Sequence, residues 1–352
     1  MTASRADDPA ATNPHAAPLD AFGRRIEYLR VSLTDRCNYR CVYCMPAAGL
    51  PWLGRADLLN DDEIVEVVRQ LSVMGLRRVR LTGGEPTLRP TLVGLVGRLR
   101  ALGTLDDLSL STNGVRLAAL APALAAAGLD RVNVSVDSLD PRRAAAVARR
   151  DLGLDPLRAL DAAERAGLTP LKVNVVVMRG VNSDEVEALA ALSVDRPWHV
   201  RFIELMPVGE LADSLMAEGR DPAELVVPSD EVLARVTAWG ERFGRAAAPA
   251  AGPARGNGPA RYVRLSGAAG TVGVISPMTH TYCGSCNRVR LTADGRLRPC
   301  LYDAGEVALR PALRAGAPLA PLVRQALAAK PAEHLLLQRR VGGLRALSEV
   351  GG

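Results

Sequence analysis

The sequence lacks the features that would mark a membrane or secreted protein. No stretch of the 352 residues approaches 18 consecutive apolar residues, so no membrane-spanning helix is predicted. The N-terminus has no apolar run of the kind found in signal peptides. Because residues 1–20 are rich in Ala, Pro and Asp, we expect them to form a disordered leader. The chain is therefore predicted to be cytoplasmic, where structural disulfides are rare.

Aromatic residues and lysines are also scarce. Aromatic residues make up 3% of the chain, which argues against the stacking surfaces that bind single-stranded nucleic acids. The net charge is +6, and the only lysines are Lys172 and Lys330. A coding bias toward Arg explains this pattern, and it makes the two remaining lysines more informative. Without a dense basic run, charge fits a phosphorylated small molecule as well as a nucleic acid, and we predict no nucleic-acid partner.

The cysteines suggest metal chemistry. They fall into two groups of three with none left over: Cys37, Cys41 and Cys44, and then Cys283, Cys286 and Cys300. Three thiolates around a [4Fe–4S] cluster leave one iron without a protein ligand, whereas clusters that only carry electrons usually have four protein ligands. Each group is therefore a candidate for chemistry at an open iron. Zinc is the alternative, above all for the second group, where His280 lies three residues before Cys283.

Strand-like and helix-like segments alternate between residue 26 and about residue 206. Strands are predicted at 26–33, 77–82, 108–112, 131–138, 171–178 and 199–206, and helices at 61–74, 92–102, 116–127, 156–166 and 183–192. Asn60 and Glu63 form a capping-box pattern at the start of the first helix. The alternation predicts an α/β fold, a partial (βα)6 TIM-like barrel with right-handed crossovers. Ligands bind at the carboxyl ends of such strands, where CNYRCVYC, GGEP, TNG and VDS occur.

The sequence divides into three parts. Residues 1–20 are the leader, residues 21–210 the barrel core, and residues 211–352 a β-rich extension that carries the second cysteine group. Within the extension, residues 246–260 read as a flexible linker or loop, and 261–267 and 270–277 as strands.

CNYRCVYC together with GGEP resembles the radical S-adenosylmethionine (SAM) superfamily. The second group, in THTYCGSCNRVRLTADGRLRPC, and the terminal Gly-Gly resemble its GTP 3′,8-cyclase family over residues 22 to 352. This resemblance implies two [4Fe–4S] clusters and SAM as cofactor. It also implies conversion of GTP to (8S)-3′,8-cyclo-7,8-dihydroguanosine 5′-triphosphate in molybdenum cofactor biosynthesis. A 5′-deoxyadenosyl radical from SAM would abstract the C3′ hydrogen of GTP.

The resemblance also assigns residues. The first cysteine group would hold the SAM cluster, and the second group a cluster whose open iron meets guanine across a shared cavity. SAM contacts would come from Tyr43, Gly84, Ser135 and Met206. GTP contacts would come from Arg30, Arg80, Ser111 (Thr in the family), Lys172, Arg288, Val289 and Arg290. Arg201, Gly351 and Gly352 would serve catalysis, with Arg345 helping to orient the substrate and Leu347 at a position where the family usually has Met.

Several questions stay open at this stage. Charged side chains on strands face either solvent or a polar lumen, and strand alternation does not say which.

The family implies a homodimer, a flavodoxin- or ferredoxin-type electron donor, and cyclic pyranopterin monophosphate synthase as the next enzyme. One alternative is a radical SAM enzyme that modifies a peptide, although such enzymes usually have more C-terminal cysteines. The other is a non-catalytic iron–sulfur or zinc scaffold that binds RNA through its arginines.

Overall fold

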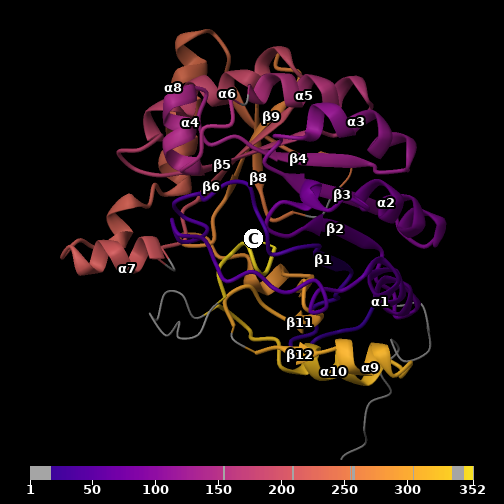
Figure 1. Ribbon diagram of the computed structural model, residues 1–352. Helices are drawn as coiled ribbons and strands as arrows, with labels where there is room; N and C mark the ends of the chain where they lie inside the picture. The colour runs from indigo at the N-terminus through magenta and orange to yellow at the C-terminus, as the bar shows by residue number, and fades with distance from the viewer. Residues whose placement is uncertain are drawn as a thin grey trace, which may run out of the picture.

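In the described part of the chain, a sheet of twelve strands runs through the protein, and its six central strands are parallel and in chain order (Figure 1). They are β1 (Tyr28–Ser32), β2 (Arg78–Thr82), β3 (Asp107–Thr112), β4 (Arg131–Ser135), β5 (Lys172–Val177) and β6 (His199–Glu204). The computed structural model describes residues 17–153, 155–207, 210–253, 255, 258–303, 305–334 and 345–351. Residues 1–16 of the expected leader lie outside this set. The expected α/β fold with six parallel strands is confirmed.

Helices connect the central strands and cover the outer face of the sheet (Figure 1). They are α1 (Asp61–Val73), α2 (Leu92–Ala101), α3 (Leu117–Ala126), α4 (Pro141–Ala148), α5 (Pro156–Arg165) and α6 (Val186–Asp195). The capping box is confirmed: Asn60 Oδ1 accepts from Glu63 N at 2.9 Å, and Glu63 Oε2 accepts from Asn60 N at 2.8 Å. Helix α4 was not expected; it begins at a Pro in its first turn, with Asp140 as N-cap.

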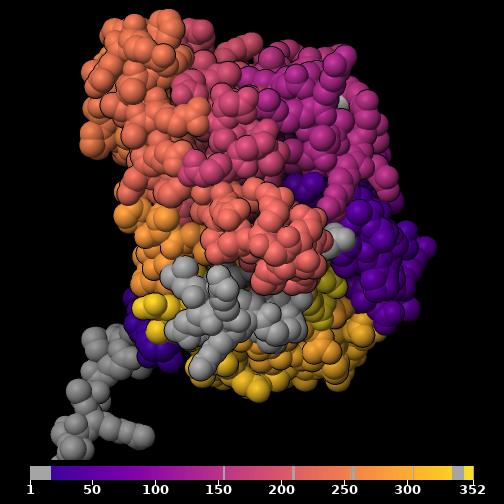
Figure 2. All heavy atoms as spheres, turned by 90° about the vertical axis from the view of Figure 1, so that its left-hand side faces the viewer, coloured from indigo at the N-terminus to yellow at the C-terminus, as the bar shows by residue number. Residues whose placement is uncertain are grey.

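The C-terminal segment extends the same sheet at both edges. Strand β10 (Arg288–Leu291) pairs in parallel with β1 and is followed outward by β11 (Arg296–Arg298) and β12 (Val307–Ala308). At the other edge β9 (Thr271–Ile275) pairs in parallel with β6, followed by β8 (Arg261–Leu265) and β7 (Ala247–Ala250). Figure 2 shows the result: orange atoms of residues near 240–270 and yellow-orange atoms near 300–330 lie at opposite ends.

The strands expected at 261–267 and 270–277 are confirmed. The expectation of a linker over 246–260 is wrong for residues 247–250, which form β7 against β8. The remaining helices of the described residues are α7 (Glu210–Ala217), α8 (Ser229–Arg242), α9 (Arg310–Arg314) and α10 (Ala320–Ala328). None of the helices in the described ranges has the length and apolar character needed to span a bilayer.

The central strands have one apolar face and one polar face. Leu29 and Val31 of β1 and Val79 of β2 belong to the main hydrophobic core beneath the helices. The residues between them, such as Arg30 and Arg80, point the other way because successive side chains alternate. The lumen of the partial barrel is therefore polar, which answers the question that the strand pattern left open.

Candidate active site

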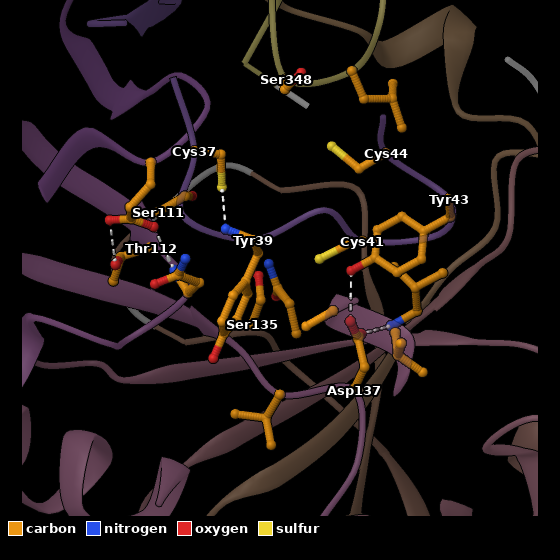
Figure 3. Close-up of a pocket in the computed structure, with 18 of the residues that line it drawn as sticks. Cys37, Tyr39, Cys41, Tyr43, Cys44, Ser111, Thr112, Ser135, Asp137 and Ser348 are labelled. Atoms are coloured by element: carbon orange, nitrogen blue, oxygen red, sulfur yellow. Dashed lines mark hydrogen bonds between the residues drawn. The ribbon is translucent and has the colours of Figure 1, made fainter. Parts of the chain in front are cut away.

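The first cysteine group lies in the loop that follows β1. All three thiols line a cavity of about 240 Å³ at the carboxyl ends of the strands (Figure 3). The residues expected to contact SAM line the same cavity: Tyr43, Gly84, Ser135 and Met206. Ser111, expected to contact GTP, is also part of its wall. The structure thus brings these sequence-predicted residues together around one space.

The glycines of GGEP allow two loops to pack closely. A Cβ on Gly84 would lie 2.2 Å from the Arg36 carbonyl oxygen and 2.5 Å from the Asp35 carbonyl oxygen. Gly83 has a φ of +142°, which L side chains rarely adopt. The Gly84 N–H donates to the Thr34 carbonyl oxygen at 2.7 Å, so the GGEP backbone is hydrogen-bonded to the cysteine loop. A side chain at Gly84 would push this loop, and its thiols, out of place.

Glu85 joins the ends of β2 and β3. Its buried carboxylate accepts hydrogen bonds from the Thr112 hydroxyl at 2.7 Å and from the Asn113 N–H at 2.8 Å. Burial raises the pKa of Glu85, and these hydrogen bonds oppose the shift. The cavity floor is thereby held together at the strand ends.

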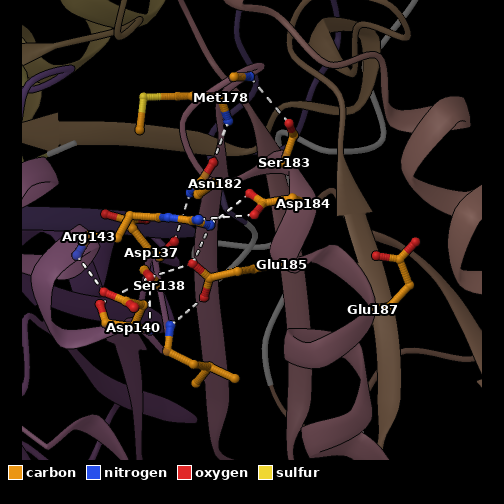
Figure 4. Close-up of polar contacts among 12 residues, drawn as sticks. Asp137, Ser138, Asp140, Arg143, Met178, Asn182, Ser183, Asp184, Glu185 and Glu187 are labelled. Atoms are coloured by element: carbon orange, nitrogen blue, oxygen red, sulfur yellow. Dashed lines mark hydrogen bonds and ion pairs between the residues drawn. The ribbon is translucent and has the colours of Figure 1, made fainter.

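Asp137, which the sequence indicated only as part of VDS and with no role of its own, ties Tyr43 to the barrel. The Tyr43 hydroxyl donates to Asp137 Oδ2 at 2.6 Å, and the Val176 N–H donates to Asp137 Oδ1 at 2.9 Å (Figure 3). Burial raises the pKa of Asp137 to about 6, against the lowering effect of the Tyr43 hydrogen bond. Asn182 Nδ2 donates to the Asp137 carbonyl oxygen at 2.7 Å and so fixes the loop after β4 (Figure 4).

The first cysteine group fits an iron–sulfur cluster. All six cysteines are free thiols, and burial raises the pKa of Cys37 to about 11 and of Cys44 to about 12. Buried thiols of this kind need metal binding to become thiolates. Within the described ranges, no group of three His, Cys, Asp or Glu side chains is placed to hold a metal ion as the side chains stand. Three thiols on the wall of a sizeable cavity instead suit a larger cluster with room for a ligand beside it.

Below this cavity the barrel lumen is lined with cations. They lie on six strands of the sheet, β10, β1 and β2 on one side of β3 and β4, β5 and β6 on the other: Arg30, Arg80, Arg131, Lys172, Arg201, Arg288 and Arg290. Register places Arg290 next to Arg30 and Arg30 next to Arg80. Asp107 neutralises Arg131 through hydrogen bonds of 2.7 and 2.5 Å.

The cations repel one another because they are buried together. Burial, together with Arg131, Arg201 and Arg80, lowers the pKa of Lys172 to about 5. Burial also lowers the pKa of Arg80 to about 10, with Tyr28 opposing the shift and Arg131 contributing to it. Lys172 is only 2% exposed, and its Nζ donates to the Arg255 carbonyl oxygen at 3.0 Å. A buried cluster of cations of this kind is suited to a polyanion.

Tyr28 adds a hydroxyl to this lumen. Its ring lies 5.4 Å from the Arg80 guanidinium, and its buried hydroxyl has no hydrogen-bond partner among the described residues. A buried hydroxyl without a partner costs about 1–3 kcal/mol, and an anionic ligand would supply the missing acceptor. The sequence could have indicated Tyr28 as a lumen residue, because Tyr28 and Arg30 are two residues apart on β1 and so share a face.

The second cysteine group lies at the other end of the lumen. β10 runs parallel to β1 with Arg288 opposite Tyr28, so Cys286 precedes the amino-terminal ends of these strands while Cys37 follows the carboxyl end of β1. The five residues of β1 span roughly 15 Å at 3.3 Å per residue. None of the second group lines the first cavity. The expectation of one shared cavity is therefore corrected to two ends of a cation-lined lumen.

The second group consists of three neighbouring thiols, and His280 is not placed as a fourth ligand beside them. Burial raises the pKa of Cys283, and the nearby Cys300 and Cys286 add to the shift. Burial also raises the pKa of Cys286, but the positive charges of Arg288 and Lys330 outweigh this and bring it to about 7. His280 Nε2 instead lies 2.6 Å from Asp230 Oδ2 on the surface. The zinc alternative thus loses the fourth ligand proposed for it.

The described end of the tail, at Gly351, lies in the lumen. Gly351, with φ +67°, has its carbonyl oxygen bound by Arg30 Nε at 3.0 Å and by Arg290 Nη1 at 2.5 Å. A Cβ there would lie 2.1 Å from Thr82 Oγ1, so only glycine fits. Gly352 lies outside the described residues. Leu347 forms part of the first cavity's wall.

The side chains of Arg345 and Val289 do not face the lumen. Arg345 does not reach into the site; it is paired with Asp294 at 2.9 Å and Glu306 at 3.0 Å, and so holds the tail from outside. Val289 points into the main hydrophobic core, so its side chain is not presented to the lumen. Arg201, 3% exposed, donates to Asn174 Oδ1 from the lumen wall.

Comparison with known proteins identifies the family. Residues 31–192 match the model of the radical SAM superfamily, and residues 198–336 match the model "Molybdenum Cofactor Synthesis C". The GTP 3′,8-cyclase of Heliobacterium modesticaldum is 46% identical over 338 residues, which cover 95% of this chain and 100% of that protein. The chain belongs to the GTP 3′,8-cyclase family. The enzyme of the same name from Moorella thermoacetica is 45% identical, over 95% of this chain and 99% of that one.

A solved structure agrees with the barrel fold of this GTP 3′,8-cyclase family member. Streptococcus suis SuiB, in its SAM-bound crystal structure, superposes with a TM-score of 0.52 at 13% identity, covering 85% of this chain and 68% of SuiB. At this identity the likeness concerns the fold alone. Membership of the radical SAM superfamily implies SAM and one [4Fe–4S] cluster, and the first cysteine group is the site that fits them.

Proposed function

We propose that this chain converts GTP to (8S)-3′,8-cyclo-7,8-dihydroguanosine 5′-triphosphate in molybdenum cofactor biosynthesis. The observation that carries the proposal is the cation-lined lumen with a cysteine group at each end. Such a lumen would suit an extended anion whose two ends reach the two cysteine groups. Near full-length identity of 45–46% to proteins named GTP 3′,8-cyclase supports the same reading.

Cys37, Cys41 and Cys44 would hold the SAM cluster, and the 240 Å³ cavity beside them would hold SAM. When bound, cluster and cofactor supply a one-electron cleavage that yields a 5′-deoxyadenosyl radical able to take the C3′ hydrogen of GTP. Gly84 and Ser135 offer polar backbone and hydroxyl groups to the cofactor, and Met206 an apolar surface. Tyr43 closes one wall, where its ring is held by Asp137.

The lumen would bind the triphosphate. Arg30, Arg80 and Lys172 face it, and Ser111 and Tyr28 add hydroxyl groups. Arginine matches phosphate oxygens with paired N–H groups, and lysine supplies a compact charge. The basic side chains of the lumen are already in place and partly shielded from water, and we propose that they hold the bound nucleotide with its ribose near the first cavity.

The second cysteine group would hold a second [4Fe–4S] cluster through Cys283, Cys286 and Cys300, with an iron left open for the guanine. Arg288 and Arg290 lie on β10, between this cysteine group and the tail, and Arg290 donates to the Gly351 carbonyl oxygen. Val289 would contribute only through its backbone. Gly351 and Gly352, with Arg201, would position the substrate during ring closure, since the tail carbonyl already bonds to two lumen arginines.

The remaining parts of the proposal concern partners. We propose a cytoplasmic homodimer that takes electrons from a flavodoxin- or ferredoxin-type donor. Its product would pass to cyclic pyranopterin monophosphate synthase. These assignments follow from the family and concern surfaces outside the site.

The function is tested by anaerobic incubation of the reconstituted protein with SAM, dithionite and GTP. We expect 5′-deoxyadenosine and cyclised dihydro-GTP in equal amounts, and no cyclised product from ATP. A Cys44→Ala variant should lose SAM cleavage, whereas Cys283→Ala should retain the first cluster's iron yet form no cyclised nucleotide. SAM cleavage driven by a peptide and not by GTP would favour the peptide-modifying alternative.

A further inference from the structure

Lys330, one of only two lysines, occupies a buried position beside the second cysteine group. It follows α10 and is 3% exposed. Its Nζ donates to the Arg288 carbonyl oxygen at 2.9 Å and to the Pro299 carbonyl oxygen at 2.5 Å. The same Nζ lies 3.6 Å from Cys286 Sγ. The three N–H bonds of the ammonium therefore have three acceptors, two carbonyls and one thiol sulfur.

These contacts join the segments that carry the cysteines. The Arg288 carbonyl lies two residues after Cys286, and the Pro299 carbonyl immediately precedes Cys300. The third cysteine is tied in by Arg24, whose Nη1 donates to the Cys283 carbonyl oxygen at 2.8 Å and to the Ala332 carbonyl oxygen at 3.0 Å. Residues 330–332 thus lie across the whole cysteine group.

We propose that Lys330 is a positioning residue for the second cluster, which fixes two of its ligand segments and sets its reduction potential through one positive charge. The inference rests on the proposed second cluster. Reduction adds a negative charge to a cluster, and a cation at hydrogen-bond distance from a ligand sulfur stabilises the reduced form. The three contacts of Lys330 Nζ all lie beside the second group, so we expect its charge to act more strongly on that cluster than on the SAM cluster at the other end of the lumen.

Lysine suits this place better than the arginine that the chain uses elsewhere. An ammonium is a compact charge with three donors in different directions, whereas a guanidinium is planar and presents its donors in one plane. The acceptors here are two backbone carbonyls and a sulfur on three different segments. This geometry explains why a lysine is present in a chain that is otherwise rich in arginine.

The test compares reconstituted wild type, Lys330→Met, Lys330→Gln and Lys330→Arg. Arg324→Met is the control, because it removes an exposed charge from α10, the helix that Lys330 follows. Iron and sulfide analysis first establishes whether the wild type holds two clusters. Anaerobic redox titrations followed by EPR then give each cluster's potential, with GTP and SAM additions distinguishing the two signals. For Lys330→Met and Lys330→Gln we expect the ratio of reduced to oxidised second cluster at a fixed potential to fall about tenfold, which is about 59 mV for one electron.

The outcomes separate the inference from the function on which it rests. If the wild type holds one cluster, the second cluster itself is refuted. If it holds two and the neutral variants keep the wild-type potential, the role of Lys330 is refuted. If the neutral variants lose the second cluster, Lys330→Arg, which keeps the charge but not the three separate donor directions, must retain more of the cluster than Lys330→Met and Lys330→Gln; equal loss from all three variants would refute the role of the charge. Arg324→Met should leave both potentials unchanged.

Discussion

Lys172 is expected to take up a proton when GTP binds. Burial, reinforced by Arg131, Arg201 and Arg80, lowers its pKa from 10.5 to about 5. At pH 8 the free protein therefore has a neutral Lys172, with on the order of one molecule in a thousand protonated. A bound triphosphate places negative charge beside the amine and restores its ordinary pKa. Binding at pH 8 should then be coupled to uptake of about one proton.

The same shift affects stability, and its sign follows from linkage. The pKa of Lys172 is lower in the folded than in the unfolded protein, so stability without ligand is lost as the pH falls from 10.5 toward 5. At pH 8 the ligand-free protein is therefore less stable than above pH 10.5 by about 3 kcal/mol, at about 1.36 kcal/mol per pH unit. Lys172→Met removes this cost, so we expect the ligand-free variant to unfold at higher denaturant concentration while binding GTP more weakly.

Anaerobic calorimetry of GTP binding in two buffers with different heats of ionisation measures the proton uptake. The difference between wild type and Lys172→Met isolates the contribution of this residue, and Arg158→Met serves as a control for an exposed cation on α5. GTP affinity of the wild type should fall about tenfold per pH unit between pH 6 and pH 9. Equal proton uptake by wild type and Lys172→Met would show that the lysine is already charged in the free protein, and the reasoning would fail.

Three further substitutions test the walls of the site. Asp137→Asn weakens the hold on Tyr43, and we expect SAM affinity to fall about tenfold in anaerobic equilibrium binding. Gly84→Ala should displace the cysteine loop and lower the iron content of the first site, while Gly94→Ala, with open space around its Cβ, should leave it intact. Arg345→Ala frees the tail from its two carboxylates, so GTP affinity should fall about tenfold with the free energy of unfolding within about 1 kcal/mol of wild type.

Each of these expectations has a result against it. Full SAM affinity in Asp137→Asn would mean that the Tyr43 hydroxyl does not need its carboxylate partner. Normal iron content in Gly84→Ala would mean that the loops separate without harm. Wild-type GTP binding by Arg345→Ala would mean that the tail holds its place without the outer ion pairs.

Local patterns in the sequence were sufficient for the six parallel strands and for the approach of the first cysteine group to GGEP. Helix α1 begins where Asn60 and Glu63 predicted, because a capping box depends only on residues three positions apart. The first cysteine group lies next to GGEP because both follow parallel strands, whose carboxyl ends share one edge of the sheet. The alternation of β1 and β2 did not say whether the charged side chains face solvent or the lumen; that came from the fold.

Long-range contacts were beyond such patterns. Strand β7 arises from pairing with β8, and nothing local in an Ala- and Pro-rich segment indicates a partner. Asp137 gained its role from Tyr43, 94 residues away, and Arg345 from carboxylates at Asp294 and Glu306. The separation of the two cysteine groups required the parallel register of β10 on β1, which spacing along the chain does not reveal.

The central claim is that the lumen presents C3′ of GTP to the cavity beside the first cysteine group. Anaerobic turnover with 3′-deuterated GTP, SAM and dithionite tests it directly, with GTP deuterated at C2′ as the control. We expect deuterium in the recovered 5′-deoxyadenosine from the 3′-labelled substrate only. SAM cleavage with no deuterium transferred from C3′, or with transfer from C2′, would contradict it.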